Sequence, residues 1–385
     1  MGRFRDALAG PGLAAIAEVK RRSPSAGDLR PDADPGRLAA AFERAGAAAV
    51  SILVDERFAG SIDDLRSARA AARVPLLAKG FFSDVAELDE LKRAGADAAL
   101  LILRDLDDRR AAELMAHAER IGLDTLVEAH DEAELGRAAA LGADPIGVNA
   151  RDLSTFAIDR SAQLALVAAA PRDRVVIAES AIHSRAHGAE AELAGADAVL
   201  VGTALMKAPD PAARLSELIS RPLVKVCGLT RHEDVAAAAD AGADLCGFIL
   251  VDASPRRAER VLPVPEGVLP VAVLVGEAVE AGTELVQLYP AQPGSVRGRD
   301  AVLLRNGEPV ATVVDLPWEE SDSTHLERAR ATEGRVVLAG GLGPENVREA
   351  IEAVQPWAVD ASSSLESSPG IKDHDRVRQF VEAAR

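Results

Sequence analysis

A short phrase that recurs along the chain constrains its fold more than any other feature. It reads AGAAAVSIL at residue 45, AGADAALLIL at 94, LGADPIGV at 141, AGADAVLVG at 194 and AGADLCGFIL at 241. Each copy joins an Ala-rich helical pattern to a buried apolar strand, with Gly where the helix ends. Apolar strands that alternate with helices predict a parallel sheet covered by helices.

The first half of the chain contains eight such strands. We expect them at 14–20, 48–54, 74–80, 98–103, 124–130, 145–150, 174–180 and 198–203. Eight strands favour a closed (β/α)₈ barrel over an open doubly wound sheet. A helix over 211–219 follows, and the Ser-Arg-Pro stretch at 220–222 marks a junction. The first domain is therefore expected at 1–220.

The second half, residues 221–385, starts the pattern again. Its strands are expected at 224–228, 245–250, 269–275, 285–289, 301–305, 311–316, 335–340 and 358–363. This half is shorter than the roughly 200 residues usual for such a barrel. Asn306-Gly307 between two apolar runs is a hairpin signal, and the gap is too short for a parallel crossover. The sequence thus predicts an α/β protein with two tandem (β/α)₈ TIM barrels, the second short and irregular, with a helix missing.

Composition narrows the possible partners. A net charge of −17 argues against nucleic acid or an anionic membrane surface as the main partner. No segment is apolar and long enough to be a signal peptide or a membrane span. Two cysteines, Cys227 and Cys246, argue against a disulfide framework and fit a cytoplasmic protein. The oligomeric state stays open, and a monomer is compatible with the sequence.

The lysines stand out because the chain has only six of them beside thirty-eight arginines. In such a chain, a Lys inside an apolar strand is unlikely to serve merely as a positive charge. A compact ammonium can be tuned to donate a proton, whereas a guanidinium effectively cannot. Lys20 and Lys79 are therefore candidate catalytic residues.

Polar side chains end most strands of the first half. One charged strand end alone could be a salt bridge at the barrel rim, but five together predict an acid–base site. Gly-containing turns after the seventh and eighth strands, which lead into a helix N-terminus, are the usual phosphate site of this fold. The residues concerned are Glu18, Lys20, Lys79, Glu128, Asn149, Arg151, Glu179, Ser180, Gly202 and Thr203.

Six ordered motifs of this half resemble the indole-3-glycerol-phosphate synthase family: IAEVKRRSPSAGDL, LLAKGFF, LVEAH, GVNARDLSTF, AESAI and LVGTALM. The resemblance implies decarboxylating ring closure of a phosphorylated carboxyphenylamino-deoxyribulose to the indole. Lys79 would be the general acid, and Lys20 would hold the departing carboxylate. Glu18 and Glu128 would be acid–base partners. The resemblance assigns substrate positioning to Asn149, Arg151 and Glu179, and phosphate binding to Ser23, Ser180, Gly202 and Thr203.

Two departures from the family pattern lie at this site. The family's Lys-Asp-Phe reads Lys79-Gly80-Phe81, which removes a carboxylate beside the proposed acid. The family's Glu-Ser-Gly turn reads Glu179-Ser180-Ala181. We expect Ala181 to forbid the backbone conformation that glycine reaches easily.

In the second half, Cys227 ends the first strand just before a Gly-Leu-Thr turn. A strand Cys is more often a small buried hydrophobe, as Cys246 is expected to be, but Cys227 could act as a general base if its thiolate is stabilised. Asp315 closes the apolar run ATVV and is the natural acid partner. Its alternative role is a helix N-cap before Pro317.

Five motifs of this half resemble the phosphoribosylanthranilate isomerase family: VKVCGLTRHEDV, GFILVDASPR, VQLY, VVLAGGLGPENV and VDASSSLESSPGIKD. That family performs an Amadori rearrangement whose product the first half would consume. The resemblance implies that Cys227 removes a proton from the sugar carbon, that Asp315 protonates the ring oxygen and that Arg256 grips the anthranilate carboxylate. It also implies a phosphate site at Gly340, Gly341, Ser362 and Ser363. The family's Leu-His-Gly is replaced by Leu288-Tyr289-Pro290.

The sequence therefore predicts a bifunctional cytoplasmic enzyme of tryptophan biosynthesis that acts on small anionic phosphorylated substrates, without metal or organic cofactor. One alternative is an active synthase whose second barrel serves only as a structural or binding module. Another is a two-barrel sugar-phosphate enzyme of histidine biosynthesis. Such enzymes work through paired aspartates, whereas this chain offers Lys/Glu and Cys/Asp sets.

Overall fold

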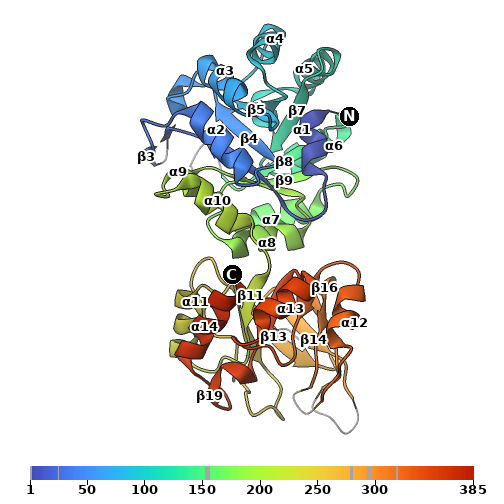
Figure 1. Ribbon diagram of the computed structural model, residues 1–385. Helices are drawn as coiled ribbons and strands as arrows, with labels where there is room; N and C mark the ends of the chain where they lie inside the picture. The colour runs from blue at the N-terminus through green and yellow to red at the C-terminus, as the bar shows by residue number, and fades with distance from the viewer. Residues whose placement is uncertain (1, 25, 152–156, 278–280, 293–296, 318–319) are drawn as a thin grey trace. The chain divides into compact units, whose positions relative to one another are not determined.

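The chain folds as two compact units in the computed structural model, which describes residues 2–24, 26–151, 157–277, 281–292, 297–317 and 320–385. Residues up to His183 together with His187–Ile219 form one unit, and Ser184–Ala186 with Ser220–Arg385 form the other. Each unit is built around its own closed eight-stranded barrel (Figure 1). The predicted α/β fold with two tandem barrels is confirmed.

All eight strands of the first barrel run parallel to their neighbours and lie where the alternating pattern predicts them. They are β1 (Ala14–Val19), β4 (Ala49–Leu53), β5 (Leu76–Lys79), β6 (Ala98–Ile102), β7 (Asp124–Ala129), β8 (Ile146–Asn149), β9 (Val176–Glu179) and β10 (Ala198–Val201). The barrel closes because β1 pairs with both β4 and β10. The carboxyl ends of all eight strands therefore meet at one mouth.

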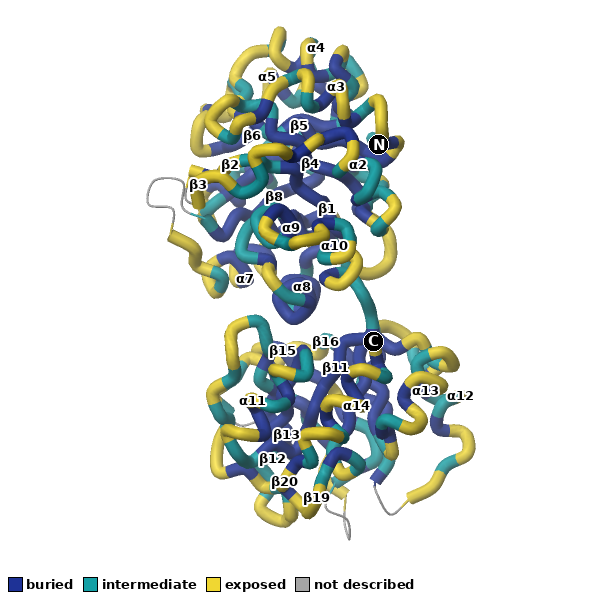
Figure 2. The backbone as a smooth tube through the Cα atoms, turned by 60° about the vertical axis from the view of Figure 1, so that its left-hand side comes forward, coloured by how far each residue is buried: buried dark blue, intermediate teal, exposed yellow. Residues whose placement is uncertain are grey.

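Helices cover the outside of this barrel, and the strands inside them are buried (Figure 2). Several helices begin at an aspartate, such as Asp107 and Asp131, whose side chain accepts a backbone N–H of the first turn. The helices are α2 (Pro35–Arg44), α3 (Ile62–Ala71), α4 (Val85–Ala94), α5 (Asp108–Arg120), α6 (Glu132–Ala140), α7 (Arg160–Ala169), α8 (Arg185–Ala194), α9 (Thr203–Met206) and α10 (Pro211–Ile219). Two short strands, β2 (Arg22–Ser23) and β3 (Gly27–Asp28), pair in the loop after β1.

Apolar side chains fill the barrel interior from below the mouth. Ile16, Leu77 and Ile177 lie in this interior cluster. The first helix, α1 (Arg3–Leu8), adds Phe4 and Leu8, which are completely buried, to the same cluster. The helix thereby closes the end of the barrel opposite the mouth.

The aspartate of the recurring phrase has a structural role. In four copies this carboxylate accepts the backbone N–H of the first residues of a neighbouring strand, at 2.8–2.9 Å. Because the start of a strand would otherwise leave a backbone donor unpaired, the aspartate stabilises the amino-terminal end of the barrel. The pairs are Asp97 with Leu76, Asp144 with Val175, Asp197 with Val176, and Asp244 with Val224.

The second barrel contains the eight predicted strands, but one of them is reversed. They are β11 (Leu223–Val226), β12 (Leu245–Ile249), β13 (Leu269–Val275), β14 (Leu285–Tyr289), β15 (Ala301–Arg305), β16 (Glu308–Val314), β17 (Val336–Leu338) and β18 (Ala358–Ala361). Strand β15 is antiparallel to both β14 and β16. Asn306 and Gly307, with φ of +50° and +87°, form the turn between β15 and β16. The predicted hairpin and missing helix are confirmed.

More helices are missing from this barrel than the sequence indicated. Its helices are α11 (His232–Ala241), α12 (His325–Ala331), α13 (Val347–Val354) and α14 (His374–Ala384), and a hairpin of β19 (Glu366–Ser368) and β20 (Ile371–Lys372) precedes the last one. Among the described residues, no helix lies between β12 and β16. Because β15 runs backwards, residues 297–300, which precede it, lie at the mouth of the barrel.

Candidate active sites

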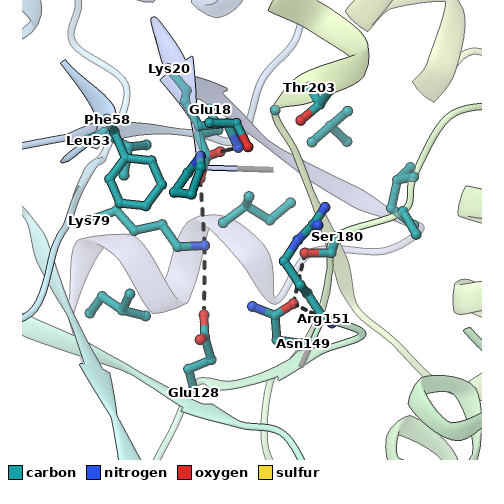
Figure 3. Close-up of a pocket in the computed structure, with 18 of the residues that line it drawn as sticks. Glu18, Lys20, Leu53, Phe58, Lys79, Glu128, Asn149, Arg151, Ser180 and Thr203 are labelled. Atoms are coloured by element: carbon teal, nitrogen blue, oxygen red, sulfur yellow. Dashed lines mark hydrogen bonds and ion pairs between the residues drawn. The ribbon is translucent and has the colours of Figure 1, made fainter. Parts of the chain in front are cut away.

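A pocket of about 310 Å³ opens at the mouth of the first barrel. Figure 3 shows polar and charged side chains converging from β1, β5, β7 and β8. Ten of the eleven residues predicted for this site line the pocket, and Glu179 contacts Lys79 from behind them. The lining residues are Glu18, Lys20, Ser23, Lys79, Glu128, Asn149, Arg151, Ser180, Gly202 and Thr203.

Lys79 lies at the centre of this site, surrounded by carboxylates. Its Nζ is 2.5 Å from Glu179, 3.6 Å from Glu18 and 3.8 Å from Glu128. Burial alone would lower the pKa of Lys79, but the three carboxylates outweigh burial and raise it well above its usual value. The ammonium is therefore charged and carries a proton that it can donate.

Glu128 and Glu179 are buried close together, and their pKa values move apart. Burial raises the pKa of Glu179 to about 8, and the charge of Glu128 adds to this effect although Lys79 opposes it. Burial would also raise the pKa of Glu128, but His130 and Lys79 outweigh it and lower that pKa to about 2. Near neutral pH, Glu128 is thus a carboxylate while Glu179 holds a proton. Two carboxyl groups whose pKa values differ in this way can serve as a base and an acid.

His130 is a residue of this site that the sequence analysis missed. Its Nε2 lies 3.1 Å from Glu128 and its Nδ1 lies 2.9 Å from Glu134. Both ring nitrogens face carboxylates, which favours the imidazolium form and raises the pKa of His130 despite its burial. The only sequence signal was its place two residues after Glu128 in the LVEAH motif, on the same side of the strand.

The remaining polar residues form two further groups at the mouth. Nζ of Lys20 lies 2.6 Å from Glu18. Across the pocket, Oδ1 of Asn149 accepts hydrogen bonds from the Ser180 hydroxyl (2.8 Å) and the Arg151 backbone N–H (3.0 Å). Gly147 leaves room for this site, because a Cβ there would lie 2.2 Å from Oε1 of Glu179.

The turn after β9 corrects one expectation. Ala181 has φ of +56°, in the left-handed region that we expected alanine to forbid, and Ser180 before it has φ of +70°. The surroundings hold this turn in place: Arg160 donates to the Ala181 carbonyl at 3.1 Å, and Ile182 is buried. The backbone therefore keeps a glycine-like turn, and Ala181 bears strain of about 1–2 kcal/mol.

A second pocket, of about 390 Å³, lies at the mouth of the second barrel. All seven residues predicted for the second site line it: Cys227, Arg256, Asp315, Gly340, Gly341, Ser362 and Ser363. Cys227 is only 5% exposed. Burial raises the pKa of the Cys227 thiol, and the nearby Lys225 ammonium partly opposes this rise. Lys225 is itself held by Asp360 at 2.7 Å and Gln287 at 2.8 Å.

The charged residues of the second pocket are paired with one another. Arg256 Nε lies 2.9 Å from Glu366, which also pairs with Lys372 at 3.0 Å. Oδ2 of Asp315 accepts from the Tyr289 hydroxyl at 2.5 Å and lies 2.9 Å from Arg297. The sequence analysis did not assign roles to Tyr289, Arg297 or Glu366.

The alternative role of Asp315 as a helix N-cap finds no support. Within the described residues, the next helix after Asp315 is α12, which begins only at His325.

The described ranges contain no group of three or more His, Cys, Asp or Glu side chains that could hold a metal ion. None of the helices in the part of the chain that the structure describes has the length and apolar character needed to cross a bilayer.

Different family models match the two halves of the chain. Residues 2–218 match the family model for indole-3-glycerol phosphate synthase, and residues 319–383 match that for N-(5'phosphoribosyl)anthranilate isomerase. An indole-3-glycerol phosphate synthase of Mycobacterium ulcerans is 44% identical over 56% of this chain and 79% of its own length. A multifunctional tryptophan biosynthesis protein of Phycomyces blakesleeanus is 30% identical over 97% of this chain, which spans 62% of that protein. The phosphoribosyl anthranilate isomerase structure from Thermotoga maritima is 28% identical, with a TM-score of 0.34, over 43% of this chain and 98% of that one.

Two barrels, each with a pocket of charged side chains at its mouth, define a bifunctional (β/α)₈-barrel enzyme. The chain belongs to the indole-3-glycerol phosphate synthase family, and a phosphoribosylanthranilate isomerase domain follows in its second half. It thus combines a lyase and an isomerase of tryptophan biosynthesis in one chain, as the sequence motifs predicted.

Proposed function

We propose that the two barrels catalyse consecutive reactions. The second barrel, residues 221–385, isomerises phosphoribosylanthranilate by an Amadori rearrangement. The first barrel, residues 1–220, closes the ring of the product with loss of CO₂ and water, giving indole-3-glycerol phosphate. The observation that carries this proposal is the position of Lys79, whose Nζ lies within 3.8 Å of three buried carboxylates at a barrel mouth.

In the first barrel, Lys79 is the general acid at the substrate carbonyl. Its proton, held between carboxylates in the free enzyme, passes to the carbonyl oxygen as the aromatic carbon attacks. Lys20 holds the departing carboxylate and assists dehydration. Glu128, which stays ionised, accepts a proton, with Glu18 as its partner. Glu179 positions the substrate, as the sequence predicts. It also holds a proton that it can donate near neutral pH.

The polar rim of the first pocket orients the substrate. Asn149 and Arg151 lie beside the charged centre, and Ser180 is fixed by its hydrogen bond to Asn149. Ser23, Ser180, Gly202 and Thr203 bind the phosphate. The start of α9 at Thr203 supports this, because backbone N–H groups at a helix N-terminus favour an anion.

In the second barrel, Cys227 removes a proton from the sugar carbon and Asp315 protonates the ring oxygen. The positive charge of Lys225 supports the thiolate of Cys227. Arg256 binds the anthranilate carboxylate. Gly340, Gly341, Ser362 and Ser363 hold the phosphate through backbone N–H groups.

The substrates of both barrels are small phosphorylated anions, and we place the enzyme in the cytoplasm, which its two free cysteines fit. An assay of the purified chain with each substrate separately tests the proposal. Turnover of both substrates is expected. Synthase turnover without isomerisation would favour the second barrel as a structural or binding module, a reading consistent with the pairing of Arg256 to Glu366.

A further inference from the structure

The carboxylate of Asp315 is enclosed by donors that come from the irregular part of the second barrel. Its Oδ2 accepts a hydrogen bond from the Tyr289 hydroxyl at 2.5 Å and forms an ion pair with Arg297, whose Nη2 lies 2.9 Å away. Its Oδ1 lies 2.6 Å from the backbone nitrogen of Leu316. The Arg297 guanidinium also lies over the Tyr289 ring, with Cζ 4.4 Å from the ring centroid. The contacts of Asp315 with Tyr289, Arg297 and the Leu316 backbone favour its ionised form.

The reversal of β15 explains how Arg297 reaches this place. Residues that precede a reversed strand lie at the mouth, so Arg297 is beside the end of β16 and donates to the Leu316 carbonyl at 3.1 Å. Tyr289 ends β14 at the same mouth. Its hydroxyl accepts from Gln287 at 2.7 Å, and Gln287 accepts from Lys225 at 2.8 Å. Hydrogen bonds thus connect Asp315 to Lys225, the neighbour of Cys227.

Other charges also face Asp315. Asp360 on β18 disfavours its ionisation. Asp300 accepts the Asp315 backbone N–H at 2.9 Å, and Arg328 on α12 pairs with Asp300. Burial raises the pKa of Asp315, with Asp360 adding to the rise, whereas Arg297 and Tyr289 lower it.

We infer that Tyr289 and Arg297 are positioning residues of the isomerase: they fix the Asp315 carboxyl at the pocket and set the pH range in which it can donate a proton. This inference rests on the proposed role of Asp315 as the acid. Tyr289 stands where the family motif has His, and Arg297 precedes the reversed strand β15.

The first test is the pH profile of isomerisation. An acid donates only while protonated, so activity falls as pH rises through its pKa. Tyr289→Phe keeps the ring but removes the hydroxyl, and Arg297→Met removes the cation. Each change should move the alkaline limb up by about one pH unit, because a hydrogen bond to a charged group has about this effect. Each should also lower the maximal rate by about tenfold, because the carboxyl loses its orientation.

Arg299→Met is the matched control. Arg299 lies two residues further along and forms its ion pairs with Glu320 and Asp322 rather than with Asp315. This variant should keep the wild-type pH profile. Synthase activity of the same samples reports whether each variant folds.

The second test does not depend on turnover. Tyr289 is the one tyrosine of the sequence, so tyrosinate absorbance reports its ionisation alone. Burial and the Asp315 charge raise the pKa of Tyr289 well above its usual value. Asp315→Asn should therefore lower the pH at which tyrosinate appears in the folded protein, with circular dichroism as the check on folding, whereas Arg299→Met should not.

The outcomes separate the inference from the proposed function. If the wild type isomerises but Tyr289→Phe and Arg297→Met keep its pH profile and rate, the inference is overturned. If the wild type does not isomerise, the proposed function of the second barrel fails, and the tyrosinate titration decides whether Tyr289 and Asp315 are coupled. An unchanged titration in Asp315→Asn would then overturn the inference as well.

Discussion

Nζ of Lys79 lies 2.5 Å from a carboxylate oxygen of Glu179, although a hundred positions separate the two residues in the chain. The contact crosses the mouth of the first barrel from the end of β5 to the end of β9, which are not adjacent strands. A substrate carbonyl bound in this pocket must compete with Glu179 for the hydrogen bond that Lys79 donates. The contact between Lys79 and Glu179 therefore holds the site together, and the same Lys79 ammonium takes part in the proposed reaction.

Lys79→Ala should lower synthase activity by about a hundredfold to ten-thousandfold, the usual range for loss of a general acid. Isomerisation should be unchanged, because every described residue that lines the Lys79 pocket belongs to the first barrel. Steady-state rates for both substrates check this. Lys92→Ala, on α4 outside both pockets, is the control. A Lys79→Ala enzyme with most of its synthase activity would remove Lys79 from the mechanism.

Cys227→Ser and Asp315→Asn should each reduce isomerisation by about a hundredfold or more without unfolding the chain. Serine is close to cysteine in size but far less acidic, so this change tests thiolate chemistry rather than packing. The synthase rate of the same samples serves as the folding control. Full activity in Asp315→Asn would direct the search for the acid to Asp322.

The synthase rate should fall as pH rises through about 8, where Glu179 loses its proton. Glu179→Gln imitates the neutral carboxyl, so this variant should lack that limb of the pH profile while it retains the Lys79-dependent reaction in part. Rates over a pH series for wild type and variant make the comparison. The same limb in both enzymes would assign it to another group.

His130→Gln should destabilise the folded protein in a pH-dependent way. Because the pKa of His130 is raised in the folded state, its imidazolium stabilises the fold fully below the unfolded value of 6.5. This contribution disappears as pH rises through the folded pKa. Denaturant unfolding should therefore show a larger loss of stability at about pH 6 than at about pH 9. An equal loss at both pH values would argue for packing alone.

Ala181→Gly should stabilise the first barrel by about 1 kcal/mol, because glycine adopts the observed φ without strain. Denaturant unfolding measures the effect. Ala112→Gly, at an exposed position inside α5, should instead destabilise by about 1 kcal/mol. Loss of stability in both variants would contradict the strain assigned to Ala181.

The sequence predicted every strand of both barrels and many of the residues that line each mouth, because apolar periodicity and strand ends are local patterns. Contacts between residues that are far apart in the chain depend on how the backbone runs in three dimensions, so local patterns could not predict them. Arg297 reaches Asp315 only because β15 is reversed, and the sequence indicated that reversal only through Asn306-Gly307. Ala181 was misjudged because residue preference favours one backbone region while its neighbours impose another.

The reversed strand also gives the second barrel a place for engineering. The Asn306–Gly307 turn lies at the end opposite the mouth, and residues 306–308 are exposed. Exposed loop tips of this kind accept inserted segments best. A reporter peptide or a whole guest domain grafted between Asn306 and Gly307 would leave the loops of the mouth uninterrupted.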